Sequence, residues 1–272
     1  MAGEAAETEP GSGKYTVASV ARALRLVEAV VDGPPDGLTV SDLATALGTS
    51  KSTAYALART LVDAGYLRDV PPGPRYQPGM ALVRHGDVAG QRFPLGRLCH
   101  PVMVELSRST GLTIRCAVPE RGYPVFIERV DAPGAIRFHA PLGVRELPHT
   151  SSAGKAILAT MPEGEVRALA AECGLPRRTR KSIATVEELL ADLEVTRRRG
   201  FAVDDEEDVE GVFCVGAACY DHLGRCLGAL SATGIKLDLP AHRVEELGRA
   251  VRGAAEEVGT LVGGGRAVRA VP

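Results

Sequence analysis

One segment of the chain combines side chains that suit the recognition of double-stranded DNA. Lys51, Ser52, Tyr55 and Arg59 recur at spacings that place them on one face of a helix predicted over residues 51–64. Hydroxyl and aromatic groups near the start of such a helix can reach base edges and phosphates, and a basic group further along can hold the phosphate backbone. The same residues would also produce an ordinary amphipathic helix with a solvated polar face. With their neighbours and one arginine further along, the candidate DNA contacts are Thr49, Ser50, Lys51, Ser52, Thr53, Tyr55, Arg59 and Arg75.

A second segment gathers hydroxyls and small residues at the expected start of another helix. Ser151 and Ser152 precede Ala153 and Gly154 there, in a helix predicted over residues 151–160. The free N–H groups at such an end, together with two hydroxyls, could converge on an anion. The alternative is a capped helix packed by small residues. A phosphate-binding loop is excluded, because the lysine after Gly154 is followed by alanine instead of Ser or Thr.

A third segment is acidic, with six Asp or Glu in the seven positions 204–210. Such a run is typical of a solvated loop. It lies, however, between strand-like Phe201–Val203 and the apolar run Val212–Val215. Both a solvated loop and a functional role therefore stay open for these carboxylates.

The first of these segments belongs to a predicted winged helix-turn-helix over residues 14–79. Helical periodicity predicts three helices, at 20–31, 40–47 and 51–64. Gly48 permits the tight turn between the second and third helices, and Ser50 suits the N-cap of the third. Two short strands with a hairpin tip at Pro71–Pro74 follow, and Arg75 beside the tip could contact a phosphate or the minor groove. This order of elements favours DNA binding over a plain amphipathic helix.

The rest of the chain predicts an α+β domain over residues 95–262, preceded by a helical linker at 80–94 that is broken near Phe93-Pro94. Strands are predicted at 113–118, 125–130, 135–139, 212–220 and 226–233, and helices at 151–160, 185–199 and 240–262. The ends, 1–13 and 263–272, are predicted to be a disordered and a flexible tail.

Several motifs together resemble the IclR family of bacterial regulators. They follow one another in family order between about residues 16 and 262: SVARAL at 19–24, the segment 38–48, KSTA at 51–54, HTSSAGKA at 149–156, RGFAVDDEE at 199–207 and GVFCV at 211–215. The resemblance implies an N-terminal winged helix-turn-helix joined by the linker to a C-terminal GAF-like effector-binding domain. It also implies a dimer or a dimer of dimers, and control of an operon for carbon-source or aromatic metabolism.

The resemblance further implies which residues line an effector pocket. Asp204 and Cys214 would line it, and Ser151 joins them as the first hydroxyl at the helix start. The remaining implied pocket residues are Phe138, Ser152, Ala153, Val212, Ser231 and Thr233. Ser152 departs from the Gly or Ala common at that position in organic-acid sensors. We expect a small organic or aromatic acid, with its carboxylate at the helix start and a hydroxyl that donates to Asp204.

Composition limits the other functions. Hydrophobic residues make up 45% and charged residues 24%, as in soluble globular proteins, and no apolar run is long enough to span a membrane, which predicts a cytoplasmic protein without a membrane partner. The net charge is −2, but residues 14–92 carry nine Lys or Arg against seven Asp or Glu, a balance that permits DNA binding. The six cysteines lack zinc spacing and predict reduced, core-filling thiols.

We therefore expect a transcriptional regulator whose operator binding is modulated by a small metabolite, with no catalytic residue, metal or cofactor. An enzyme with a helical N-terminal lid is the alternative from another class, although there is no G-x-S-x-G motif and Cys214 has no base that the sequence identifies. A DNA-binding protein with a purely dimerising C-terminal domain is a third reading of the chain, but it leaves the serine segment and Asp204 without a role.

Overall fold

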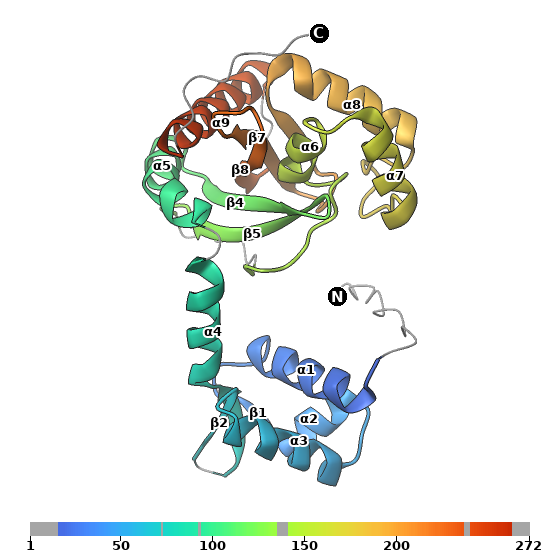
Figure 1. Cartoon of the computed structure of the whole chain (residues 1–272), viewed down its shortest axis with the longest axis vertical. Coiled ribbons are helices and arrows are strands. Elements are labelled where there is room, and N and C mark those ends of the chain that lie inside the picture. Colours follow the sequence, from blue (N-terminus) through green and yellow to red (C-terminus); the bar gives the residue numbers. More distant parts are fainter. Residues whose placement is uncertain (1–15, 72, 92–93, 135–140, 237–239, 263–272) are drawn as a thin grey trace. The chain divides into compact units, whose positions relative to one another are not determined.

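Helices and strands of the chain group into two units, Met1–Arg92 and Phe93–Pro272 (Figure 1). The structure is a computed structural model that describes residues 16–71, 73–91, 94–134, 141–236 and 240–262. Each unit has its own hydrophobic core.

The first unit is a winged helix-turn-helix, as predicted. Its elements are α1 (Ala18–Val31), β1 (Leu38–Thr39), α2 (Val40–Leu47), α3 (Lys51–Asp63), β2 (Leu67–Val70), β3 (Arg75–Pro78) and α4 (Met80–Gln91). The strands form an antiparallel sheet in the order β1-β3-β2, which is the wing. The two-residue strand β1 was not predicted, because it is too short for strand periodicity to show in the sequence.

Local side-chain chemistry fixes the turn between α2 and α3. Thr39 and Asp42 form a capping box at the start of α2, with the Thr39 N–H donating to Asp42 at 2.8 Å. Gly48 ends α2 with φ of 60°, a left-handed conformation that a side chain would disfavour. Ser50 caps α3 and accepts a hydrogen bond from the Thr53 N–H. The predicted glycine turn and serine cap are both confirmed.

The apolar pattern of α1 does not correspond to its buried face. Leu26 and Val30 are buried in the core of the first unit. Val20 and Leu24, which helped to predict the helix, are 55% and 59% exposed. The 3.6-residue period identified the helix correctly, but α1 carries apolar residues on two faces and only one of them packs within the unit.

The second unit is an α+β domain built on one antiparallel sheet. Its elements are α5 (Leu95–Thr110), β4 (Thr113–Glu120), β5 (Tyr123–Val130), α6 (Ser152–Leu158), α7 (Glu163–Cys173), α8 (Val186–Arg199), β6 (Ala202–Asp205), β7 (Val212–Tyr220), β8 (Cys226–Ile235) and α9 (Ala241–Leu261). The strand order is β5-β4-β8-β7-β6. The long helices α5 and α9 pack against one face of the sheet, and α6 packs against the other (Figure 1).

The two faces of the sheet differ in chemistry, since successive strand residues point to opposite sides. On the α5 and α9 side, Ile114, Cys116, Val215, Leu230 and Ala232 belong to the largest apolar cluster of the described residues. The opposite side carries a smaller apolar cluster together with several buried polar residues. Buried polar groups need partners, so this second face is where a functional site is expected.

Two differences from the predicted elements concern the region around α6. The helix ends at Leu158, two residues before the predicted end, and α7 was not predicted. In α7 only Val166, Leu169 and Ala170 are buried, so its apolar stripe is short and hard to recognise in the sequence. The strand predicted at 135–139 lies outside the described residues.

Candidate functional sites

The outer face of α3 is the first candidate site. Lys51, Ser52 and Tyr55 are exposed, with Tyr55 at 50%, whereas Ala54 and Ala58 on the opposite side are buried. The predicted division of the helix into an inward and an outward face is therefore confirmed. An exposed aromatic ring on the second helix of a helix-turn-helix is free to reach a base edge.

The hydroxyls at the start of α3 are already organised by the helix cap. Ser50 Oγ lies 2.9 Å from the hydroxyls of both Ser52 and Thr53, and also accepts the Thr53 N–H. Thr49 is half-buried and its N–H donates to Ala44. Ser52 thus presents an oriented hydroxyl at an exposed position, while Ser50 and Thr49 hold the backbone.

Two arginines predicted to contact DNA are engaged in ion pairs within the unit. Arg59 lies 3.3 Å from Asp63 and 3.4 Å from Asp69. Arg75 donates to the Gly37 carbonyl at 2.8 Å and lies 3.1 Å from Asp36, so it ties the wing to the loop before β1. Both side chains remain about two-fifths exposed, at 42% and 39%, so a phosphate could still compete for them.

The second candidate site is a row of residues across the sheet on the side of α6. Asp204 pairs with Cys214 between β6 and β7, and Cys214 pairs with Thr233 between β7 and β8. Thr113 on β4 continues the row beside Thr233. The sequence places these residues far apart, and strand register brings them side by side. All four are buried, and Val212 lies further along β7 on the same side as Cys214.

A neighbouring row lies directly under the start of α6. Ser231 on β8 pairs with Arg115 on β4 and with Gly216 on β7. Ser152 Oγ lies 3.0 Å from Ser231 Oγ, so the helix start is bonded to the sheet. A Cβ at Gly216 would lie 2.6 Å from the Ser152 carbonyl oxygen, which explains why glycine is required for this approach. The structure thus joins four predicted pocket residues, Ser152, Ser231, Thr233 and Cys214, on one surface.

The predicted anion site at the start of α6 is partly occupied by the protein itself. Ser151 caps the helix and accepts the Gly154 N–H at 3.0 Å, and the Ser152 hydroxyl is taken by Ser231. Ala153 is fully buried in the apolar cluster under α6. Phe138, also predicted to line the pocket, lies outside the described residues.

Burial governs the protonation of Asp204, which is 2% exposed. Its Oδ1 accepts the Glu207 N–H at 2.7 Å. Burial raises the pKa of Asp204 to about 6, against the opposing effects of that hydrogen bond and of Lys155. Burial, together with the neighbouring Asp204 charge, holds the pKa of the Cys214 thiol well above its ordinary value, so this thiol is neutral and suits a packing role.

Lys155 forms a buried ion-pair network behind α6. Its side chain is fully buried, and Nζ lies 2.6 Å from both carboxylate oxygens of Glu207 and 3.4 Å from Asp192. Burial nevertheless raises the pKa of Glu207 to about 7. Both oxygens of Glu207 are used, so this pair anchors the acidic loop to α6. The exclusion of a phosphate-binding loop agrees with this internal role of the lysine.

Sequence reasoning missed two charged residues on this face, Arg115 and Glu146. Arg115 is 7% exposed, and its Nη1 donates to Glu146 Oε1 at 2.6 Å. The guanidinium also stacks on the Phe126 ring, 3.7 Å from its centroid. The signal in the sequence was an arginine inside the otherwise apolar strand Ile114–Val118, where a charge is unusual without a partner.

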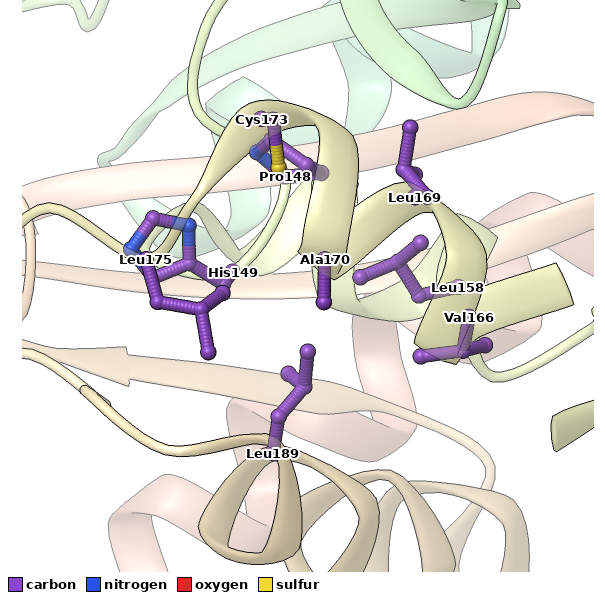
Figure 2. A pocket seen from close by; sticks show the side chains of 9 residues that line it. All are labelled: Pro148, His149, Leu158, Val166, Leu169, Ala170, Cys173, Leu175 and Leu189. Atoms are coloured by element: carbon purple, nitrogen blue, oxygen red, sulfur yellow. The ribbon is translucent and has the colours of Figure 1, made fainter. Parts of the chain in front are cut away.

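An apolar hollow beside α6, α7 and α8 lies apart from these polar rows. Figure 2 shows the hydrophobic side chains that converge on it. It is lined by Pro148, His149, Leu158, Val166, Leu169, Ala170, Cys173, Leu175 and Leu189, which pack closely enough to leave no room for a water molecule. The His149 ring at its edge is buried, which lowers its pKa and favours the neutral form. No predicted pocket residue lines this hollow, so it does not coincide with the candidate site on the sheet.

The described residues contain neither a metal-binding cluster nor a membrane-spanning helix. No group of three or more His, Cys, Asp or Glu in that part of the chain is placed to hold a metal ion. No helix in the same ranges is long and apolar enough to cross a membrane.

Known proteins resemble the chain along nearly its whole length. The family model described as the IclR helix-turn-helix domain matches residues 19–71, and that of the bacterial transcriptional regulator IclR C-terminal matches residues 89–260. The acetate operon repressor of Salmonella typhimurium is 32% identical over 268 residues, which cover 96% of this chain and 95% of the relative. The transcriptional repressor IclR of Escherichia coli is 31% identical with the same coverage.

Solved structures agree with these sequence matches. The IclR protein of Thermotoga maritima superposes with a TM-score of 0.78 at 28% identity, covering 90% of this chain and 98% of that one. An IclR homologue from Microbacterium hydrocarbonoxydans, complexed with 4-hydroxybenzoate, gives a TM-score of 0.74 at 22% identity with the same coverage and shares the fold. The matched families are transcriptional regulators and not enzymes, so the lid-enzyme alternative is wrong. The chain belongs to the IclR family of bacterial transcriptional regulators.

Proposed function

We propose that the outer face of α3 enters the major groove of operator DNA. Ser52 and Tyr55 would reach base edges, while Lys51 and Arg59 would hold phosphates. The observation that carries this proposal is the exposed polar and aromatic face of α3, directly after a capped helix-turn-helix turn. With DNA as its partner, the protein would act in the cytoplasm, where the operator is.

We infer that the protein reads its operator as a dimer or a dimer of dimers. One winged helix makes too few base contacts for a unique genomic address, and paired half-sites supply the rest. Val17, Val20 and Leu24 are 61%, 55% and 59% exposed, and their spacing of three and four residues matches the seam along which two helices pack. A second copy of α1 would cover this stripe.

We propose that a small organic or aromatic acid binds on the α6 side of the sheet. Asp204, Cys214, Ser231 and Thr233 supply polar groups on three adjacent strands, and Ser152 supplies another from α6. Their burial on a face without the large apolar cluster is what supports a ligand site there. The 4-hydroxybenzoate complex of the Microbacterium homologue supports the class of acid.

Ligand binding would change operator affinity by favouring one of two arrangements of the DNA-binding units. The effector domain, residues 95–262, would act on the DNA-binding domain, residues 14–79, through the helical segment 80–94. A ligand can shift this balance only by the difference between its affinities for the two arrangements.

Calorimetry on the full chain tests the ligand site. A screen of organic and aromatic acids should find compounds that bind the wild-type protein and that lose affinity in both Ser152→Leu and Asp204→Ala. Thr260→Leu, at an exposed position of α9, is the matched control and should bind normally. Operator binding without ligand should persist in all variants. Unchanged ligand affinity in both site variants would move the pocket elsewhere.

A further inference from the structure

We propose that Arg115 is the anion-binding residue of the effector site, and that Glu146 occupies its guanidinium when no effector is bound. This inference rests on the proposed function, because it assigns the chemistry of the same sheet face. The inference goes beyond the proposed function by naming the ligand class, a monocarboxylate, and the internal group that the ligand replaces.

The position of Arg115 places a cation inside the candidate site. Its side chain is only 9% exposed. Arg115 shares its row with Ser231 and points to the same side of the sheet as Phe126, which belongs to the apolar cluster under α6. The Phe126 ring covers one face of the guanidinium and fixes its plane. The positive charge is therefore held rigidly beside the predicted pocket residues.

Two buried polar atoms near this cation lack a nitrogen or oxygen partner among the described residues. Arg115 Nε has no hydrogen-bond partner among the described residues, and Thr233 Oγ1, in the adjacent row on β8, has no nitrogen or oxygen partner there. The Cys214 thiol, a weak hydrogen-bonding group, lies next to Thr233. Buried N–H and O–H groups are normally satisfied, so a missing acceptor at this point indicates a ligand oxygen.

Glu146 is suited to leave Arg115 in exchange for a ligand. Its side chain is 26% exposed and belongs to the segment between β5 and α6, outside both elements. Burial raises the pKa of its carboxyl despite the opposing charge of Arg115. Glu207 provides the contrast, because both of its oxygens bind the fully buried Lys155. The Lys155–Glu207 pair uses both oxygens of its carboxylate. The Arg115–Glu146 pair leaves the Arg115 Nε–H without an acceptor among the described residues.

A carboxylate fits the guanidinium donors of Arg115. Two parallel N–H groups of a guanidinium match the two oxygens of a carboxylate. Asp204, in the adjacent row on β6, would repel a second carboxylate on the same ligand. Since Glu146 precedes α6 in the chain, its displacement would remove the side-chain contact between the segment 141–149 and β4, while the backbone hydrogen bonds of Gly143 and Glu146 to β5 stay in place. Ligand binding would in this way be coupled to a local change in the protein.

Nitrogen NMR of the full chain, labelled with ¹⁵N-arginine, observes Arg115 directly. Its Nε–H resonance is assigned by its absence in Arg115→Lys. The probes are acetate, benzoate and 4-hydroxybenzoate, each compared with its neutral amide. At least one acid should shift the Arg115 resonance, and the matching amide should not. No shift with any of the three acids, or an equal shift with acid and amide, would overturn the proposal.

The Glu146→Gln variant tests the exchange. It removes the competing charge while keeping the side-chain size, so the acid that shifts Arg115 should bind about tenfold more tightly, equivalent to about 1.4 kcal/mol. Glu257→Gln, at an exposed position of α9, should not change the affinity. Weaker or unchanged binding in Glu146→Gln would contradict the exchange.

The outcomes separate this inference from the proposed function. An acid that binds the wild type and Arg115→Lys equally, yet is lost in Ser152→Leu, would remove Arg115 from the site and leave the site itself standing. An acid that shifts Arg115 but leaves operator affinity unchanged would support the anion site and contradict the proposed regulation.

Discussion

Replacing Asp204 with asparagine should stabilise the protein relative to the wild type at neutral pH. This advantage of the variant should shrink at acidic pH. Asparagine has nearly the same shape and keeps an oxygen that can accept the Glu207 N–H. What it removes is a carboxylate that is 2% exposed. The variant therefore isolates the cost of keeping a charge buried at this point of the sheet.

The size and sign of the effect follow from the pKa. Burial raises the pKa of Asp204 from 3.8 to about 6, so between these values the folded protein binds more protons than the unfolded chain. Stability of the wild type then falls as the pH rises through this window. The shift of about two units corresponds to roughly 3 kcal/mol, which is fully lost above about pH 6. The neutral asparagine side chain of the variant carries no such loss.

Differential scanning calorimetry of the full chain measures the stability of the second unit at each pH. Its unfolding transition is compared between Asp204→Asn and the wild type. The stability difference should shift in favour of the variant by up to about 3 kcal/mol between about pH 4 and pH 7.5. Glu257→Gln, which removes an exposed carboxylate, is the control and should show no comparable change. A difference that does not vary with pH would refute the assignment of a buried, costly charge to Asp204.

Three other predictions follow from the two units. Tyr55→Ala should lower the preference for operator over random DNA by about tenfold, as measured by fluorescence anisotropy. Arg59→Ala should instead weaken binding to both DNAs and reduce the salt dependence by about one ion. Equal effects of Tyr55→Ala on both DNAs would contradict a base contact. Lys155→Met should cost about 3–5 kcal/mol in urea unfolding, because the partly buried carboxylates of Glu207 and Asp192 lose a fully buried cation. A cost near zero would show that water reaches these carboxylates. Leu24→Glu should dissociate the oligomer in light scattering, while Arg25→Glu beside it should not; an intact oligomer in Leu24→Glu would exclude the α1 interface.

Local patterns in the sequence were sufficient to predict the DNA-binding unit. The helix period, the Gly48 turn and the Ser50 cap each act within a few residues, so α2 and α3 could be placed almost to the residue. The exposure of Leu24 could not be predicted, because an apolar residue has the same helical spacing whether it packs within the unit or against another surface.

The arrangement of the residues on the ligand face could not be predicted from local patterns in the sequence. Asp204, Cys214 and Thr233 were named through the family resemblance, and only strand register shows that they form one row. Arg115 was missed for the same reason. Its partner Glu146 is 31 positions away, and nothing in the sequence states that β4 lies beside β8.

The central claim is that a small acid, bound on the α6 side of the sheet, sets the affinity of the protein for its operator. Fluorescence anisotropy with an operator duplex selected from a random pool tests this most directly, in wild type and Ser152→Leu, with and without the acid found by calorimetry. The acid should change the operator affinity of the wild type by about tenfold, within the usual range of allosteric coupling, and should leave that of Ser152→Leu unchanged. The same change in both proteins, or no change in the wild type at saturating acid, would contradict the claim.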